Sequence, residues 1–107
     1  MKGAPWFKFW VSDFRGGTSE MTPHEVGVYT RLLCIQWEQM SLPNDPSRLA
    51  VMAGGSVPEI VVGKFDAGED GRLRNARLEQ ERKGATTRSV MAGAAANARW
   101  GADRNAD

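Results

Sequence analysis

The sequence predicts a small α+β domain with a winged helix-turn-helix arrangement, and three observations support this. A capping signal at residues 22–25 starts a long apolar helical pattern. Two shorter helical segments follow, separated by a Gly-Gly pair at residues 54–55. An Asp70-Gly71 turn signal then joins two short strands. At 107 residues, the chain has the length of one domain of this kind.

The N-terminal residues 6–11 are aromatic and β-branched, which predicts a short strand. We expect this strand to pair with the C-terminal hairpin, because a lone hairpin is marginally stable in water. The Gly-Gly pair at residues 16–17 predicts a loop over residues 13–18. Because the strand would have to cover the first long helix, we interpret its aromatic residues as core rather than as a platform for nucleic-acid bases. These residues are Trp6, Phe7, Phe9 and Trp10.

The first long helix is predicted to run from Thr22 to about Met40. Thr22 and Glu25 form a capping box, and Pro23 suits the first helical position. Its wide apolar face is typical of a central helix, and its polar stripe contains Cys34. The chain has one cysteine and one histidine, which excludes a disulfide framework and a Cys/His zinc site and leaves no nucleophile–base pair.

A second helix is expected over residues 46–53, because an Asx cap with proline precedes this stretch and a Gly-Gly pair follows it. A second capping box at residues 56–59 predicts a third helix of about eight residues, to Phe65. In a DNA-binding winged helix this third helix contacts base edges, but here only Lys64 and Glu59 offer charged groups for such contacts. We therefore interpret its apolar residues as core, with docking of another protein as the alternative.

Charge is distributed unevenly under a formal net charge of +1. Residues 1–71 carry six Lys and Arg against nine Asp and Glu, whereas residues 72–107 carry eight against four. The sign changes at the turn of the predicted hairpin, or wing, so we expect phosphate contact from the wing onwards. The candidate nucleic-acid-binding residues are Lys64, Arg72, Arg74, Arg77, Arg82, Lys83, Arg88 and Arg99. The alternative is a solvated helix whose cations form ion pairs with Glu79 and Glu81.

The chain is expected to divide into a winged-helix domain over residues 1–83 and a basic, alanine-rich tail over residues 84–107, which is helical or partly disordered. Residues 75–83 predict a charged helix, which Gly84 is expected to interrupt. Trp100 lies in the polar tail and is the candidate partner-binding residue, since it can anchor the tail on the body of the chain or on a partner. The core is small, so a homodimer would help to stabilise it.

Many spaced residues also agree, in order, with one known family. They include Trp6-Phe7-Lys8-Phe9, Asp13-Phe14, Thr22-Pro23, Asp70-Gly71-Arg72-Leu73-Arg74-Asn75 and Ala95-Ala96-Asn97-Ala98-Arg99-Trp100-Gly101. Over nearly the whole chain the pattern resembles the YdaU-like domain of unknown function, found in prophage replication regions. The resemblance implies a winged-helix fold, a phage or prophage origin and a role near replication initiation as a DNA-binding module resembling replisome organisers.

The sequence shows no membrane span, signal peptide, phosphate-binding glycine loop or nucleophile elbow. We therefore expect no enzyme, no catalytic or metal-binding residues, no cofactor and no membrane contact, and a location in the cytoplasm of a bacterial host. The expected function is that of a phage DNA-binding module in replication initiation or regulation. The alternative is a phage-encoded factor that binds a host or phage protein complex and inhibits a host defence, in the manner of an anti-CRISPR protein, or a replication complex.

Overall fold

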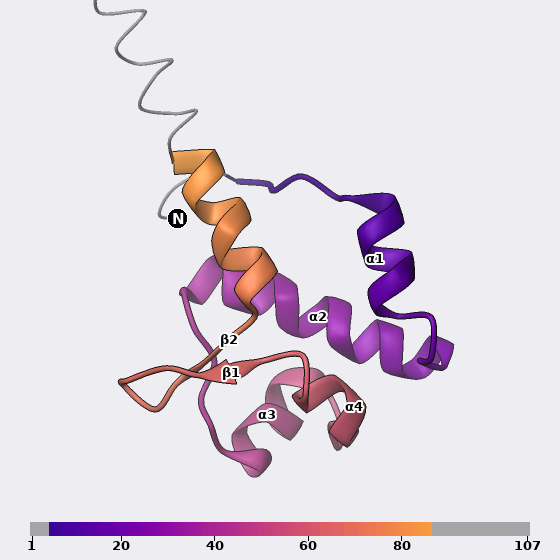
Figure 1. Cartoon of the computed structure of the whole chain (residues 1–107). Coiled ribbons are helices and arrows are strands. Elements are labelled where there is room, and N and C mark those ends of the chain that lie inside the picture. The colour runs from indigo at the N-terminus through magenta and orange to yellow at the C-terminus, as the bar shows by residue number, and fades with distance from the viewer. Residues whose placement is uncertain (1–4, 87–107) are drawn as a thin grey trace, which may run out of the picture.

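The structure is a computed structural model, and it describes residues 5–86 of the chain. In chain order its elements are α1 (Val11–Gly17), α2 (Pro23–Gln39), α3 (Pro46–Ala53), α4 (Glu59–Val62), β1 (Asp66–Ala67), β2 (Leu73–Arg74) and a helix over residues 76–86. Helices and a small antiparallel sheet make up an α+β fold, as predicted. In Figure 1, α3 and α4 lie on one side of α2, and α1 and the C-terminal helix lie on the other.

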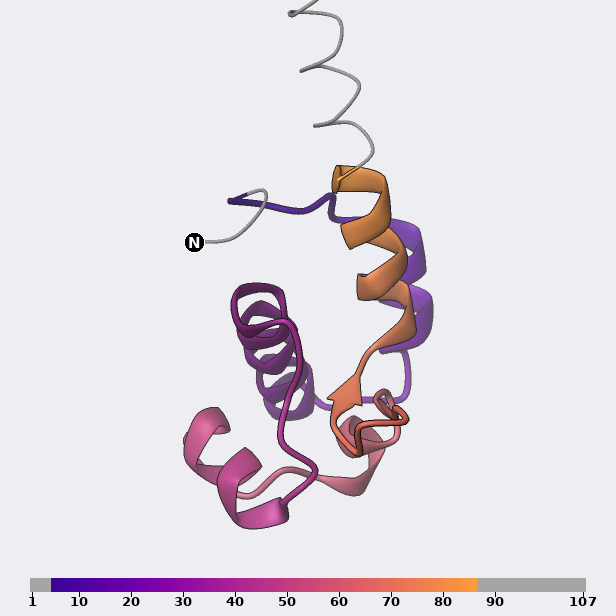
Figure 2. The same cartoon turned by 90° about the vertical axis from the view of Figure 1, so that its left-hand side faces the viewer.

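Helix α2 is the centre of the core and begins at the predicted capping box. The Thr22 hydroxyl accepts from the Glu25 amide at 3.2 Å, and the Thr22 amide donates to the Glu25 carboxylate at 2.7 Å. Figure 2 shows the other elements arranged around this helix. The buried apolar residues are Val28, Tyr29, Leu32, Leu33, Trp37, Leu42, Leu49, Ala53, Val61, Phe65, Leu73, Leu78 and Ala85.

The N-terminal segment does not form the predicted strand, because residues 5–10 have no regular secondary structure. Phe7 instead packs against Trp37 on α2, with ring centroids 5.0 Å apart. The other three aromatic residues of the segment are exposed, so their interpretation as core is wrong; they are Trp6, Phe9 and Trp10. The physical reason is that aromatic residues occupy both odd and even positions, so a strand would carry large apolar side chains on both faces.

The predicted loop over residues 13–18 is also wrong, because most of it lies in α1. The Phe14 amide donates to the Trp10 carbonyl at 2.8 Å, which closes the first helical turn. The Phe14 ring then packs against Phe9 and Tyr29, at centroid distances of 4.8 and 5.8 Å. Packing of this ring outweighs the low helix propensity of the two glycines at the end of α1.

The hairpin of β1 and β2 forms as predicted around the Asp70-Gly71 turn. Its further pairing partner, however, is Leu42, which lies between α2 and α3, and not the N-terminal segment. Leu42 and Leu73 exchange two backbone hydrogen bonds of 2.9 and 2.8 Å. Because Leu42 is fully buried, this bridge fixes the hairpin against the core.

Helix α3 covers the predicted residues and ends at Gly54, which adopts a φ of 83°. This left-handed conformation favours glycine. A Cβ atom at Gly54 would also lie 2.8 Å from Nη1 of Arg31, an atom that donates a hydrogen bond to the Ala53 carbonyl. The turn between α3 and α4 therefore depends on this glycine.

Gly54→Ala is expected to lower the free energy of unfolding by about 1–2 kcal/mol, because alanine is strained at a positive φ. Gly55→Ala is the matched control, since a Cβ atom there meets nothing within 4 Å. Its expected effect is within about 0.5 kcal/mol. Urea unfolding of both variants measures the difference, and equal losses would contradict the requirement at Gly54.

Helix α4 is shorter than predicted and covers only Glu59–Val62. No side chain caps its N-terminus, so the capping box predicted at residues 56–59 does not form. After Val62 the backbone continues in tighter turns, with hydrogen bonds of 3.0 Å from Lys64 to Val61 and from Phe65 to Val62, and Phe65 is buried in the core. Val61 is fully buried and Ile60 packs against the core, which confirms the interpretation of these residues as core.

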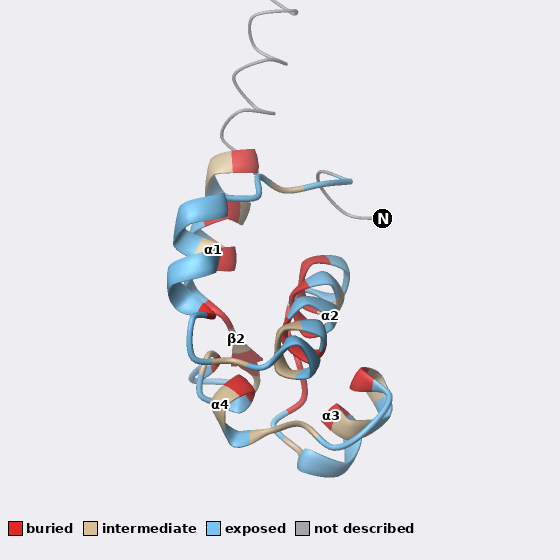
Figure 3. Ribbon diagram, turned by 90° about the vertical axis from the view of Figure 1, so that its right-hand side faces the viewer, coloured by how far each residue is buried: buried red, intermediate tan, exposed pale blue. Residues whose placement is uncertain are grey.

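The C-terminal helix begins after Asn75, whose side-chain oxygen accepts from the Leu78 amide at 2.9 Å. Gly84 does not interrupt this helix, and the next residue, Ala85, is buried. Leu78 and Ala85 are spaced to share one helix face, and Figure 3 shows the buried residues of this helix on the side of α2. Packing of that face compensates for the glycine. The domain boundary between residues 83 and 84 stays a prediction.

Candidate binding surfaces

The predicted nucleic-acid-binding residues fall into groups with different surroundings. Lys64, Arg72 and Arg74 lie in or beside the hairpin, and Arg77, Arg82 and Lys83 lie on the C-terminal helix. Three further predicted site residues lie outside the described residues: Arg88, Arg99 and Trp100. Whether each remaining cation can contact a phosphate depends on the groups that already surround it.

Arg74 is held by a carboxylate of its own hairpin. Its Nη1 and Nη2 donate to the two carboxylate oxygens of Asp70 at 3.1 and 2.7 Å. These hydrogen bonds hold the pKa of the Asp70 carboxyl well below its usual range. Both terminal nitrogens of the Arg74 guanidinium are bound to Asp70, and the carboxylate balances the positive charge. Arg74 is therefore poorly placed to contact a phosphate.

Arg72 has different surroundings, although it lies two residues away. Its Nε donates to the Ser41 hydroxyl at 2.6 Å, just beyond the end of α2. Within residues 5–86 no carboxylate forms an ion pair with Arg72, with half-buried Lys64 or with exposed Lys83. These three cations therefore keep charge that an anionic ligand can neutralise.

Arg77 pairs with α1. Its Nη2 lies 2.7 Å from Oδ2 of Asp13, and both side chains are about half exposed. The Arg77 guanidinium carbon also lies 5.4 Å from the centroid of the Trp10 ring, within the range of a cation–π contact. Arg77 therefore belongs to the surface formed by the N-terminal segment, and not to the hairpin.

Arg82 is a structural residue. Its Nη2 donates to the carbonyls of Gln36 and Trp37 at 2.9 and 3.1 Å, at the C-terminal end of α2. Its guanidinium carbon lies 4.6 Å from the Trp37 ring centroid, and its Nε lies 3.5 Å from a Glu79 carboxylate oxygen. The predicted ion pair within the helix therefore forms, and Arg82 fastens this helix to α2.

A buried polar network joins α2, the hairpin and the C-terminal helix. The Gln36 side chain accepts from the Asn75 amide and donates to the Glu79 carboxylate, both at 2.8 Å. The Asn75 side-chain amide donates to the Tyr29 hydroxyl at 3.1 Å and to the Lys64 carbonyl at 2.8 Å. Burial raises the pKa of Tyr29, against the lowering effect of the hydrogen bond from Asn75. The network sets the positions of the cations around it.

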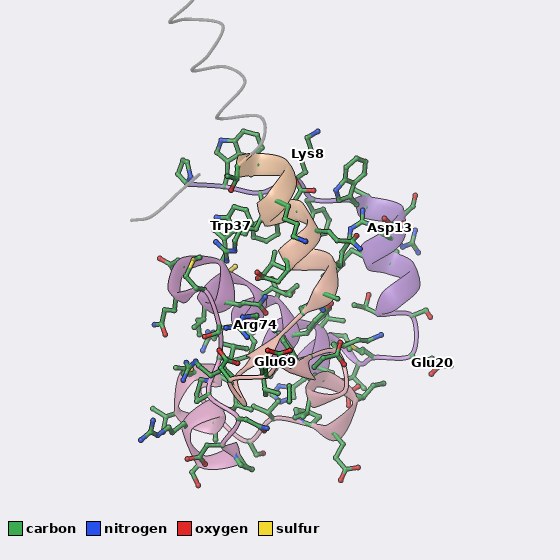
Figure 4. All side chains as sticks on the ribbon, turned by 60° about the vertical axis from the view of Figure 1, so that its left-hand side comes forward. Lys8, Asp13, Glu20, Trp37, Glu69 and Arg74 are labelled. Carbon is green, nitrogen blue, oxygen red and sulfur yellow. The ribbon has the colours of Figure 1, made fainter. Side chains whose placement is uncertain are left out.

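A second candidate surface consists of the exposed aromatic residues of the N-terminal segment. Trp6, Phe9 and Trp10 are 61, 58 and 48% exposed, and we call these three residues the aromatic surface. The Trp10 Nε1 donates to a Glu81 carboxylate oxygen at 3.0 Å, and the Nζ of Lys8 lies 5.6 Å from the Trp10 ring centroid. Figure 4 shows Lys8 well away from Arg74, so the hairpin lies apart from the aromatic surface, whereas the C-terminal helix contacts it through Arg77 and Glu81.

A mainly apolar pocket of about 240 Å³ adjoins the aromatic surface. The N-terminal segment, α1, α2 and the C-terminal helix all contribute to its lining. Its aromatic lining includes Phe7, Phe9, Trp10, Phe14 and Tyr29. Polar residues also line it from each of these segments; they are Lys8, Asp13, Thr30, Asn75, Arg77 and Glu81. The pocket therefore offers flat apolar walls together with hydrogen-bonding groups, which suits a planar or apolar group of a ligand.

Sequence reasoning missed the pocket, and it interpreted the residues of the aromatic surface as core rather than as a platform for bases. One signal was present, because Trp10 and Phe14 are four residues apart, which is helical rather than alternating spacing. Their distances from Trp37 and Tyr29 depend on tertiary packing and leave no local pattern. No group of three or more metal-ligating residues gathers among the residues that the structure describes.

No helix in the described part of the chain is both long and apolar enough to cross a membrane. Residues 5–82 match the model of the family DUF1376, described as a protein of unknown function. The matched residues include the hairpin and both sides of the pocket. No curated protein and no solved structure matches the chain.

Proposed function

Because the chain belongs to the DUF1376 family, whose description states no function, we propose its function from its own geometry. The chain is a DNA-binding module with a winged-helix fold, and it contacts the phosphate backbone through the hairpin and the helix that follows it. It acts in phage replication initiation or regulation, in the cytoplasm of the bacterial host. The phage and replication part of this role rests on the resemblance to the YdaU-like domain, and the geometry supports only the contact with phosphates.

The order of elements supports the winged-helix part of the proposal. Helices α2, α3 and α4 are followed by a hairpin, and Leu42 supplies a short extended partner between the first two of these helices. A helix-turn-helix followed by a paired hairpin is the arrangement that places a wing beside a nucleic acid. In this interpretation, α1 and the C-terminal helix are additions at the two ends of the motif.

The observation that carries the DNA-binding proposal is the charge of residues 72–86. This stretch has five Lys and Arg against two Glu, of which Arg74 and Arg77 pair with Asp70 and Asp13, and Arg82 binds carbonyls of α2. Arg72 and Lys83 have no carboxylate partner within the described residues, so their charges are the ones that phosphates would neutralise. The tail cations Arg88 and Arg99 are proposed to extend this surface.

The expected contact is with the backbone and not with base edges. Helix α4 has four residues, and it presents Glu59 and the half-exposed Val62 rather than Arg, Lys, Asn or Gln. Arg74 is already paired with Asp70. Binding should therefore depend weakly on sequence and strongly on salt.

The double variant Arg72→Ala, Lys83→Ala is expected to bind a short DNA duplex roughly tenfold more weakly at low salt. The slope of log K against log salt should also fall in size by about 2, because each lost phosphate contact removes about one unit. Fluorescence anisotropy with a labelled duplex between about 50 and 200 mM salt measures both quantities.

Arg48→Ala is the matched control, since Arg48 is an exposed arginine on α3 with only a long ion pair of 3.7 Å to Asp45. Its affinity and salt slope should equal those of the unmodified chain. If the unmodified chain binds no duplex at the lowest salt, the DNA-binding proposal is wrong.

A second candidate function is that of a factor that binds a protein complex, such as a host defence or replication complex. It is favoured by a group of exposed carboxylates on α4 and the hairpin, which are Glu59, Asp66, Glu69 and Asp70. Except for Asp70, which Arg74 balances, these have no ion-pair partner within the described range. Exposed carboxylates without a counter-charge complement a basic surface, including one that itself binds nucleic acid.

A further inference from the structure

We propose that the aromatic surface and the adjoining pocket bind single-stranded DNA. Bases stack on Trp6, Phe9 and Trp10, and one base enters the pocket. This inference rests on the proposed nucleic-acid function and adds to it a second form of ligand at a separate surface. Stacking on aromatic rings suits single strands, because a base must leave its pair before both of its faces are free.

The first support is the exposure of three large aromatic rings within five residues. Their exposed fractions are 48% or more, although the chain folds a core directly beneath them. Phe7, in the same segment, shows that this stretch can place an aromatic ring against α2. Adjacent exposed aromatic rings beside a pocket mark a binding site more often than a chance feature of the surface.

The second support is that two of the three rings, Phe9 and Trp10, are held in place by contacts with other elements. Phe9 packs on Phe14 with ring centroids 4.8 Å apart, and Phe14 stacks on buried Tyr29 at 5.8 Å with an interplanar angle of 9°. Trp10 is fixed by its hydrogen bond to Glu81. A platform that is already ordered loses little side-chain entropy when a base stacks on it.

The third support is the pair of cations beside Trp10. The Nζ of Lys8 and the guanidinium carbon of Arg77 lie 5.6 and 5.4 Å from its ring centroid. The phosphates that follow a stacked base would lie close to these groups. The Arg77–Asp13 pair is half exposed, and such pairs are weak, so a phosphate can replace the carboxylate at little cost.

The pocket fits the same ligand. Its volume of about 240 Å³ is enough for one aromatic ring system, and Phe14 and Tyr29 contribute flat walls. Asp13 and Thr30 bring hydrogen-bonding groups to it, which can contact the edge of a base. An apolar side chain of a protein would use the walls but would leave the charge of Lys8 without a counter-charge within the described residues, whereas a nucleic acid would also supply phosphates to it, so this charge favours the nucleic acid.

The test measures binding of labelled oligo(dT) and of a duplex of equal length to the full chain at low salt. Trp6→Ala and Phe9→Ala are each expected to weaken binding of oligo(dT) about tenfold, since base–aromatic stacking has that strength. Phe9→Leu should behave like Phe9→Ala, because leucine keeps the apolar volume but has no π face. Phe9→Trp should retain binding. None of these variants should change duplex affinity by more than about twofold.

Val51→Ala is the matched control, because Val51 is an exposed apolar residue on α3, 83% exposed, far from the aromatic surface in sequence. Thermal unfolding checks that each variant is folded. Unchanged oligo(dT) binding in Trp6→Ala and Phe9→Ala would overturn the inference, as would full binding by Phe9→Leu, which points to an apolar protein ligand. If oligo(dT) does not bind while the duplex does, the inference alone fails. If neither binds, both proposals fail.

Discussion

Asn75→Ala is expected to lower the free energy of unfolding by about 3 kcal/mol. The side-chain oxygen of Asn75 caps the C-terminal helix through the Leu78 amide, and its amide group donates to the Tyr29 hydroxyl and the Lys64 carbonyl. Loss of the cap costs about 1 kcal/mol. Each acceptor left without its donor adds about 1 kcal/mol, because Asn75 is buried and water does not replace it fully.

Urea unfolding monitored by circular dichroism measures this loss, and two further variants separate its parts. Asn75→Ser keeps a capping oxygen but removes the side-chain amide that donates the two hydrogen bonds, so it should be less destabilised than Asn75→Ala if the cap contributes. Asn44→Ala is the control, since Asn44 is exposed and precedes the cap of α3. A loss below about 1 kcal/mol for Asn75→Ala would show that the buried network does not hold the hairpin and the helix together.

The parts of the fold that sequence reasoning predicted are those that local interactions determine. The cap at Thr22 and the turn at Asp70-Gly71 use groups within three or four residues of one another, so their pattern is visible in the sequence. The pairing of Leu42 with Leu73 is different, because it joins residues 31 positions apart through backbone atoms alone. No side-chain pattern distinguishes Leu42 from the aromatic segment that the sequence favoured as the partner strand.

The candidate site shows the same division. Charge and spacing identified Arg72, Arg74, Arg77 and Arg82 as cations of one region, but not the partners that decide their roles. Asp70 is four residues from Arg74 and could be paired with it from sequence. Ser41, Asp13 and the carbonyls at the end of α2 are distant in the chain and become partners only through packing. The residues of the aromatic surface were interpreted as core for the same reason, because their exposure also depends on packing.

Arg82 gives the second large expected effect. Arg82→Leu is expected to lower the free energy of unfolding by about 2–3 kcal/mol, because it removes the hydrogen bonds to the Gln36 and Trp37 carbonyls and the cation–π contact with Trp37. It also leaves Glu79 without its ion pair in a partly buried position. Arg82→Lys keeps the positive charge but lacks the planar guanidinium with its several N–H donors. Its free energy of unfolding should therefore lie between those of the unmodified chain and of Arg82→Leu.

Arg77→Leu on the same helix is the control for charge, because the Arg77–Asp13 pair is about half exposed and should contribute less than about 1 kcal/mol. Chemical unfolding ranks the variants, and equal losses at the two arginines would contradict a structural role for Arg82.

The same variants also separate residues that stabilise the fold from residues that bind DNA. Because the Arg82 side chain is only 14% exposed, Arg82→Leu should reduce duplex affinity only under conditions where the chain begins to unfold. Arg72→Ala should reduce duplex affinity while the chain stays fully folded, since Arg72 keeps a charge that no carboxylate in the described fold balances.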